Sequence, residues 1–211
     1  MKRKLKIEIG LAVLLLLIAL FGSFLAPYDP LKVNYDFSLQ PPSFLHIFGT
    51  DKLGRDVFSR ILCGAKTSFG LTFLMLFLIV FIGMIVGLIA GLSNDKVESF
   101  FNNIINGLLA FPDTIFAIAI VGIVGAGLFN TVFALALIWW TKYARLTLAL
   151  VKQEKKKNYL VISKMSGVPP LQRIIRYLLP NILSQILVTA FLDIGNMMIS
   201  LAGLSFLGLA S

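Results

Sequence analysis

Two carboxylates, Asp113 and Asp193, lie inside long apolar segments of the sequence, where ionised groups are rare. A charge at the centre of a bilayer costs about 2.5–3.5 kcal/mol on insertion scales, so each carboxylate is expected to face water or a partner. Asn196 and Met197 follow Asp193 by about one helical turn. We expect these four residues to line a polar path whose acidic groups favour a cationic ligand. The alternative, in which a hydroxyl or basic side chain of a neighbouring helix satisfies Asp193, is left open.

Two intramembrane carboxylates also invite comparison with an intramembrane aspartyl protease. Here the surroundings are Phe-Pro-Asp-Thr and Leu-Asp-Ile-Gly, not the Tyr-Asp and Gly-x-Gly-Asp contexts of such proteases, which argues against proteolysis. His46 and Cys63 are each the only residue of their type, so this chain offers no His-cluster metal site and no internal disulfide. The segment Gly64-Ala-Lys-Thr67 lacks the spacing of a phosphate-binding loop, so we expect no catalysis and no bound cofactor.

A patterned basic segment at 152–181 lies between two of the apolar segments. Tyr159 to Ser166 is predicted to form a short helix that ends at Gly167, a residue tolerant of positive φ. Pro169 and Pro170 suit the first turn of a second helix. The apolar residues on one face of that amphipathic helix are Leu171, Ile174, Ile175 and Leu178. The segment therefore predicts a helix, a turn and a helix at the membrane surface.

The composition is that of an integral membrane protein. Of the 211 residues, 58% are hydrophobic and 14% charged, and the mean hydropathy is +0.90, which excludes a soluble globule with a polar surface. Spanning about 30 Å of hydrocarbon takes about 20 residues of helix. Five segments are long enough: Ile7 to Ala26, Ser68 to Leu92, Ile104 to Val124, Phe129 to Val151 and Ile182 to Leu204. The predicted fold is an all-α membrane protein with five transmembrane helices.

The basic residues predict the orientation. With the N-terminus inside, fourteen Lys and Arg residues lie on the cytoplasmic side and five on the other, as the positive-inside rule expects. This bias accounts for the net charge of +9, because the basic residues flank the spans and face anionic lipid; binding to nucleic acid is not needed to explain the charge. The first segment is too long for the apolar core of a cleaved signal peptide. We expect an N-terminal tail with the first span (1–26), an extracytoplasmic loop (27–67) and a core of four spans (68–211).

Two further patterns concern helix packing and the membrane interface. Gly83, Gly87 and Gly91 recur every four residues in the second span, which predicts a face on which another helix packs closely. Lys142 and Arg145 are expected to extend toward the inner interface.

The predicted external loop contains the segment Phe-Gly-Thr-Asp-Lys-Leu-Gly-Arg-Asp-Val-Phe-Ser-Arg, residues 48–60. Its glycines and alternating charges indicate a tight turn before a short helix, and a solvated loop with local ion pairs would explain it. The segment nevertheless closely resembles the signature before the second span of dipeptide, oligopeptide and nickel permeases. Its signature positions here are Gly49, Thr50, Asp51, Gly54, Arg55 and Asp56. Further matches in order are Ala110 to Pro112, Trp140 with Tyr143 to Arg145, and Leu204 to Gly208.

The basic segment resembles the EAA loop of ABC-importer permeases, which forms a coupling helix that fits a groove on the ATPase subunit. Gly167, Leu179 and Pro180 match its pattern, whereas Val161, Ile162 and Ser163 stand where Glu-Ala-Ala is usual. The resemblance implies ATPase coupling by Tyr159, Ser163, Gly167, Leu171, Ile174, Leu179 and Pro180.

The resemblance implies a type I importer permease-like fold in a bacterial inner membrane, as the second, C-type permease subunit. The implied partners are a homologous permease, two cytoplasmic ATPases that carry ATP and Mg, and an extracytoplasmic substrate-binding protein. The implied substrates are peptides, nickel or metal complexes. Family members continue beyond the Leu-Ser-Phe-Leu-Gly motif into a sixth span, whereas this sequence stops at Ser211. An inactive truncated permease and a non-transporting scaffold are the alternatives, but a scaffold does not explain both patterned loops.

Overall fold

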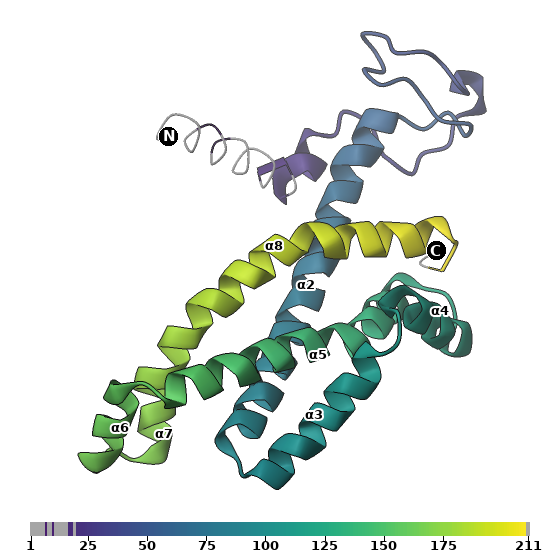
Figure 1. Cartoon of the computed structure of the whole chain (residues 1–211). Helices are drawn as coiled ribbons and strands as arrows, with labels where there is room; N and C mark the ends of the chain where they lie inside the picture. The colour runs from purple at the N-terminus through teal and green to yellow at the C-terminus, as the bar shows by residue number, and fades with distance from the viewer. Residues whose placement is uncertain (1–6, 8–9, 11–16, 19, 210–211) are drawn as a thin grey trace. The chain divides into compact units, whose positions relative to one another are not determined.

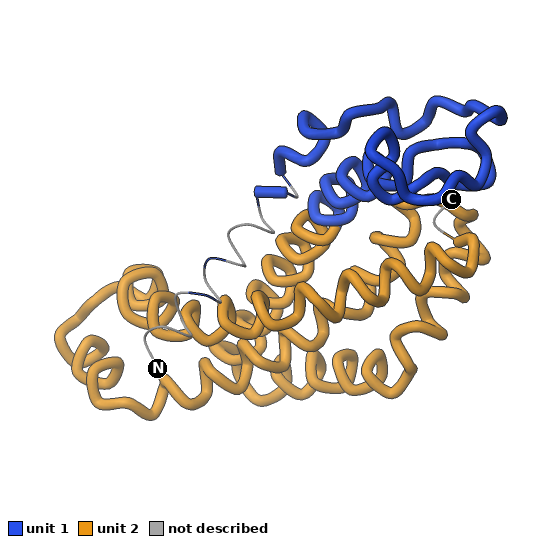
Figure 2. Tube along the Cα trace, turned by 90° about the horizontal axis from the view of Figure 1, so that it is seen from above, with its two compact units in different colours: residues 1–71 blue, residues 72–211 orange. Residues whose placement is uncertain are grey.

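A computed structural model describes residues 7, 10, 17–18 and 20–209. Among these residues the structure is helical, with one isolated β-bridge between Thr50 and Asp56 and no strand (Figure 1). The chain forms two compact units, residues 1–71 and 72–211, which Figure 2 colours blue and orange. Residues 8–9, 11–16 and 19 of the predicted first span lie outside the described residues; within it, residues 20–25 are helical.

The longest helix, α2, runs from Val57 to Leu92. The Asp56 carboxylate accepts a hydrogen bond from the Ser59 backbone N–H at 2.7 Å, as a helix N-cap does. At 1.5 Å per residue, 36 residues extend about 54 Å, more than the hydrocarbon thickness. The predicted short helix and second span, expected to begin at Ser68, are therefore one continuous helix.

Helix α5, Leu128–Lys155, is the centre of the second unit and contacts α3, α4, α6 and α8. In its most apolar stretch 61% of the residues are buried, against 33% for α2 and 28% for the helix that ends at Phe206. The predicted glycine face is confirmed. A Cβ at Gly83 would lie 2.6 Å from the Trp140 carbonyl oxygen, and one at Gly87 2.5 Å from the Thr147 Cβ, so only glycine lets α2 approach α5 this closely.

The predicted span Ile104 to Val124 is interrupted at Pro112. Two helices, α3 (Asp95–Leu109) and α4 (Asp113–Val124), meet there at a bend of 85° (Figure 1). Pro112 lies at the break, lacks a backbone N–H and disfavours helical geometry at Phe111 before it. The structure is a broken span or a re-entrant loop.

The basic segment forms α6 (Asn158–Met165) and α7 (Pro170–Arg173), close to the predicted bounds. A π-helical turn, η2 (Ile174–Leu178), then joins α7 directly to α8 (Leu179–Phe206). The Leu179 N–H bonds to the Ile174 carbonyl, five residues back. Pro180 has no N–H to donate and its ring crowds the preceding turn, so a widened turn lets the helix continue. The last predicted span thus begins well before Ile182.

Within the described residues, three helices are long and apolar enough to cross a membrane: Val57–Leu92, Leu128–Lys155 and Pro170–Phe206. A fourth span results if α3 and α4 count together. The all-helical membrane fold is confirmed for this part of the chain, whereas the number five stays a prediction.

Candidate functional site

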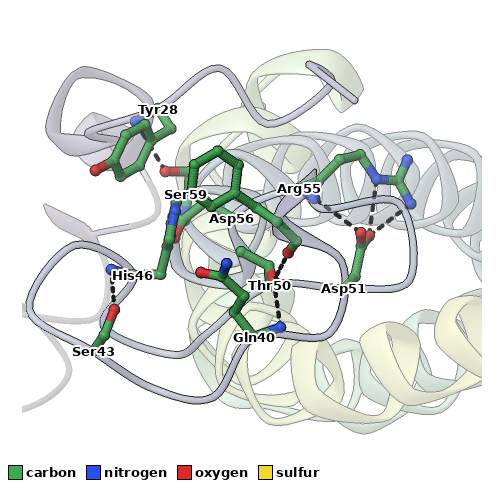
Figure 3. Close-up of polar contacts among 10 residues, drawn as sticks. Tyr28, Gln40, Ser43, His46, Thr50, Asp51, Arg55, Asp56 and Ser59 are labelled. Atoms are coloured by element: carbon green, nitrogen blue, oxygen red, sulfur yellow. Dashed lines mark hydrogen bonds and ion pairs between the residues drawn. The ribbon is translucent and has the colours of Figure 1, made fainter. Parts of the chain in front are cut away.

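The glycine-rich segment before α2 is folded onto the residues that precede it (Figure 3). Thr50 is buried, and its hydroxyl oxygen accepts a hydrogen bond from the Gln40 N–H at 2.8 Å while its hydroxyl donates to the Phe37 carbonyl. Asp56 is 3% exposed and contacts the His46 Nδ1 at 2.9 Å. The segment is therefore an ordered structure rather than a solvated loop.

Asp51 holds a tight turn together (Figure 3). Its carboxylate accepts hydrogen bonds from the backbone N–H groups of Leu53 (2.8 Å) and Arg55 (3.0 Å) and from the Arg55 Nε (2.8 Å), and it pairs with Arg60. Burial acts to raise the pKa of Asp51, but the hydrogen bonds and charge of Arg55 outweigh it and lower the pKa from 3.8 to about 2. Asp51 and Arg55 therefore act together as a structural clamp on the turn.

The signature glycines fill positions that no other residue fits. Gly54 has φ +70° and a Cβ there would lie 1.6 Å from the Asn34 carbonyl oxygen. Gly49 also has φ +70°, and its Cβ would lie 2.4 Å from the Gln40 carbonyl oxygen. The backbone of residues 34–40 lies directly against the turn, which explains both glycines by packing.

We expect Gly54→Ala to unfold the 27–56 segment. The left-handed conformation alone costs an L-residue roughly 1–2 kcal/mol, and overlap with a backbone carbonyl adds to that cost. Limited proteolysis in membranes should show rapid cleavage of the segment. Gly64→Ala, a helical glycine with open space around its Cβ, is the matched control and should remain resistant. Equal resistance of both variants would contradict the packing explanation.

The Asp51 clamp should weaken in acid. A depressed carboxyl pKa stabilises the fold above the unfolded value of 3.8, and this contribution disappears as pH falls toward about 2. Pepsin cleavage of the 27–56 segment should accelerate across that window. The Asp51→Asn variant should be cleaved readily both near pH 3.8 and near pH 2. The Asp36→Asn variant, which changes an exposed position, should behave as wild type. A pH profile unaffected by Asp51→Asn would refute the role of this carboxylate.

The carboxylate of Asp193 is buried between α5 and α8 and is not free. Lys142 Nζ lies 2.8 Å and 2.7 Å from its two oxygens, and the Tyr143 hydroxyl donates to it at 2.9 Å. The alternative left open by the sequence, a basic partner on a neighbouring helix, is thus the observed arrangement. The expectation that Lys142 extends to the interface is wrong, because this buried charge attracts it. Arg145 instead donates to Asn106 Oδ1 of α3 at 2.6 Å.

The other predicted path residues are only partly brought together. Asp113 and Lys142 line the same pocket, of ≈ 260 Å³, between the α3–α4 break and α5. Met197 is fully buried on α8, whereas Asn196 is exposed. A mixed pair of charges in one pocket within apolar helices is suited to a polar solute, but the role of these residues in a path stays a prediction.

Gly167 turns the chain between α6 and α7. It has φ +73°, its N–H bonds to the Lys164 carbonyl (3.2 Å), and the Val168 N–H bonds to the Ser163 carbonyl (3.1 Å). These two bonds are the Schellman arrangement that ends a helix at a left-handed residue. Ser163 is buried and its hydroxyl donates to the Leu160 carbonyl at 2.8 Å.

The start of α6 is tied to the end of α5. Glu154 is buried, lies 2.6 Å from Lys157 Nζ and accepts a hydrogen bond from the Tyr159 hydroxyl. Burial and the bond to the Glu154 carboxylate raise the pKa of Tyr159 to about 12, so this phenol stays a donor at neutral pH. A displacement of α6 would therefore be transmitted to α5.

Three large apolar side chains around the turn remain exposed. Ile162 is 59%, Met165 83% and Leu171 68% exposed, and we call these three the loop tip. Ile174 is half-buried, and Leu179 and Pro180 begin α8. Exposed apolar groups on a basic segment are typical of a surface that binds another protein.

Four residues of these sites were not predicted from the sequence: Lys142 and Tyr143, which contact Asp193, His46, which contacts Asp56, and Glu154, which contacts Tyr159. The contact between Lys142 and Asp193 has a signal in the sequence. Each residue lies at the middle of a 28-residue helix, so the two are expected at a similar depth in the membrane. The contact between His46 and Asp56 has no comparable signal, since it depends on how the loop folds back.

The comparisons with known proteins agree along the chain. Residues 83–211 match the family described as binding-protein-dependent transport system inner membrane component, and residues 9–42 match the N-terminal transmembrane domain of oligopeptide transport permease C. The nickel transport system permease protein of Escherichia coli (strain K12) is 35% identical over 196 residues, 93% of this chain and 71% of that protein.

Two further relatives have names that refer to other solutes. The di/tripeptide transport system permease protein of Pseudomonas aeruginosa is 38% identical over 95% of this chain and 69% of its own length. The glutathione transport system permease protein of Shigella flexneri is 36% identical over 94% of this chain and 66% of its own length. The resemblance stated from the sequence is confirmed. The chain belongs to the family of binding-protein-dependent inner membrane transport components, as a C-type permease subunit of an ABC importer.

Proposed function

We propose that this chain is one permease half of an ATP-driven importer for peptides, nickel or other metal complexes. The names of its relatives, which concern nickel, di- and tripeptides and glutathione, support these solute classes. The other half is a second, homologous permease. Two cytoplasmic ATPases bind ATP and Mg and carry out hydrolysis, and an extracytoplasmic protein delivers the solute.

The observation that carries the coupling role is the helix–turn–helix at 158–173. It presents the exposed loop tip to a partner, while Tyr159 and Glu154 connect it to the central helix α5. A lever of this kind is what a two-state transporter needs, because closure of the ATPases must move the spans between outward and inward access. Tyr159, Ser163 and Gly167 shape the lever, and Leu171 and Ile174 contribute to its apolar surface.

The proposed orientation places the N-terminus and residues 152–181 in the cytoplasm and residues 27–67 outside. The concentration of Lys and Arg residues after Leu150 supports this orientation. Five spans follow if residues 7–26 cross the membrane and α3 and α4 together count as one. The solute would pass near Asp113, Asn196 and Met197, and near Asp193 if its pair with Lys142 opens.

Two measurements test this function. Co-purification in mild detergent should retain a second permease and two ATPases, identified by mass spectrometry. In a Cys63→Ser background, a cysteine at exposed Ser166 should react with a membrane-impermeant maleimide only after permeabilisation, whereas one at exposed Asp36 should react in intact cells. Recovery of the chain alone would contradict the assembly, and the reverse labelling pattern would contradict the orientation.

A further inference from the structure

A pocket of ≈ 530 Å³ lies where the α6–α7 segment meets the ends of α2 and α5. Its apolar wall includes Leu92, the last residue of α2, together with Leu160 and Leu178. Its basic side chains are Lys155, Lys164 and Arg173, which come from α5, α6 and α7. The pocket is thus apolar on one side and carries three cations from three different helices.

The three cations have no carboxylate partner in the described part of the chain. Lys155 Nζ donates to the Gly91 carbonyl at 3.0 Å, which orients the ammonium without neutralising it. Among these residues, Lys164 and Arg173 form no ion pair. Three other lysines of the chain do form ion pairs with carboxylates: Lys142 with Asp193, Lys152 with Glu98, and Lys157 with Glu154. The positive charge of the pocket is therefore left for an external anion.

The position of the pocket limits what that anion can be. Its lining includes Leu92 and Lys155, the last residues of two membrane-length helices, and Pro170, the first residue of a third, so it lies at the boundary between hydrocarbon and water. A ligand that matches both sides carries an anionic head and an apolar chain. Basic pockets between helices at a membrane surface bind phospholipid head groups in this way.

We propose that this pocket binds an anionic glycerophospholipid, with its phosphate between Lys155, Lys164 and Arg173. The first part of an acyl chain then packs against Leu92, Leu160 and Leu178. The loop-tip residues Ile162, Met165 and Leu171 do not line the pocket, so a bound lipid leaves the loop tip uncovered, whereas Ile174 lines the pocket and would contact the lipid. The lipid would link α6 and α7 to the ends of the spans, and the site does not depend on which solute is carried.

The test is native mass spectrometry of the purified permease assembly titrated with phosphatidylglycerol or phosphatidylcholine. Wild type should retain phosphatidylglycerol preferentially, and Lys164→Gln/Arg173→Gln should lower that retention about tenfold, since two of three cations are lost. Lys164→Arg/Arg173→Lys preserves the charge and should retain the lipid. Lys32→Gln/Lys52→Gln, which removes two cations of the 27–67 segment, is the matched control and should also retain it.

Three outcomes would overturn the proposal. Equal retention of the two lipids by wild type would show that no anion site exists. Displacement of phosphatidylglycerol by millimolar inorganic phosphate or glycerol phosphate would indicate a site for a soluble phosphate. Unchanged lipid retention in Lys164→Gln/Arg173→Gln, together with loss of ATPase co-purification, would assign these cations to a protein partner. The lipid competition uses wild type alone, so it decides the question even if the double variant fails to fold.

Discussion

Gly167→Pro is expected to reduce ATP-driven uptake more than tenfold. Gly167 has φ +73°, whereas proline fixes φ near −65° and cannot donate the bond that the Gly167 N–H makes to the Lys164 carbonyl. The turn between α6 and α7 would therefore open, and the loop tip would lose its arrangement. Uptake by proteoliposomes containing the whole assembly measures the effect, with ATP hydrolysis followed in parallel.

Two matched variants separate the shape of the turn from general damage. Gly167→Asn should keep most of the uptake, because asparagine tolerates the left-handed conformation. Gly107→Ala, in the interior of α3 with open space around its Cβ, should have little effect on folding. Full uptake by Gly167→Pro, with the ATPases still bound, would show that the loop does not couple hydrolysis to transport.

Replacement of Lys142 by Met is expected to destabilise the helical core strongly. Lys142→Met leaves the Asp193 carboxylate buried with the Tyr143 hydroxyl as its remaining partner. Removing one partner of a fully buried ion pair typically costs about 3–5 kcal/mol, and a smaller loss is expected here because the Lys142 side chain is 49% exposed while Asp193 is buried. Thermal unfolding of the purified assembly in detergent should show a large fall in midpoint for Lys142→Met.

A double variant distinguishes this pair from two independent effects. Lys142→Met/Asp193→Leu removes both charges and should recover a large part of the lost stability, since no unpaired charge remains. Additive destabilisation by the two substitutions would refute the pair. Asp193→Asn, which removes the negative charge, tests the separate hypothesis of a solute path. Unchanged uptake kinetics in that variant would exclude Asp193 from the path.

The sequence predicts those features that depend on local chemistry. Gly167 could be placed at a helix end because left-handed backbone favours glycine, and Gly83 and Gly87 could be placed at a helix contact because their spacing defines one face. The break at Pro112 follows from the local chemistry of proline, whereas the 85° bend depends on how α4 packs against α5.

Features set by tertiary structure were harder to predict. Lys142 was expected at the interface because an isolated lysine in a span extends to water; the nearby carboxylate of Asp193 reverses that preference. The pocket around Lys155 and Arg173 combines side chains from three helices, so no local pattern marks it. The continuity of α7, η2 and α8 was missed because Pro180 normally signals a helix start, whereas here a π turn accommodates it.

Photo-crosslinking from the loop tip tests the coupling role most directly. A photoreactive residue at Met165, which is 83% exposed, should crosslink to the ATPase subunit in native membranes. The same group at Phe206, which is 92% exposed at the other end of α8, is the matched control and should not reach that subunit. An ATPase adduct from Met165 alone is the predicted result. No adduct from Met165, or equal adducts from both positions, would contradict the proposed coupling through this loop.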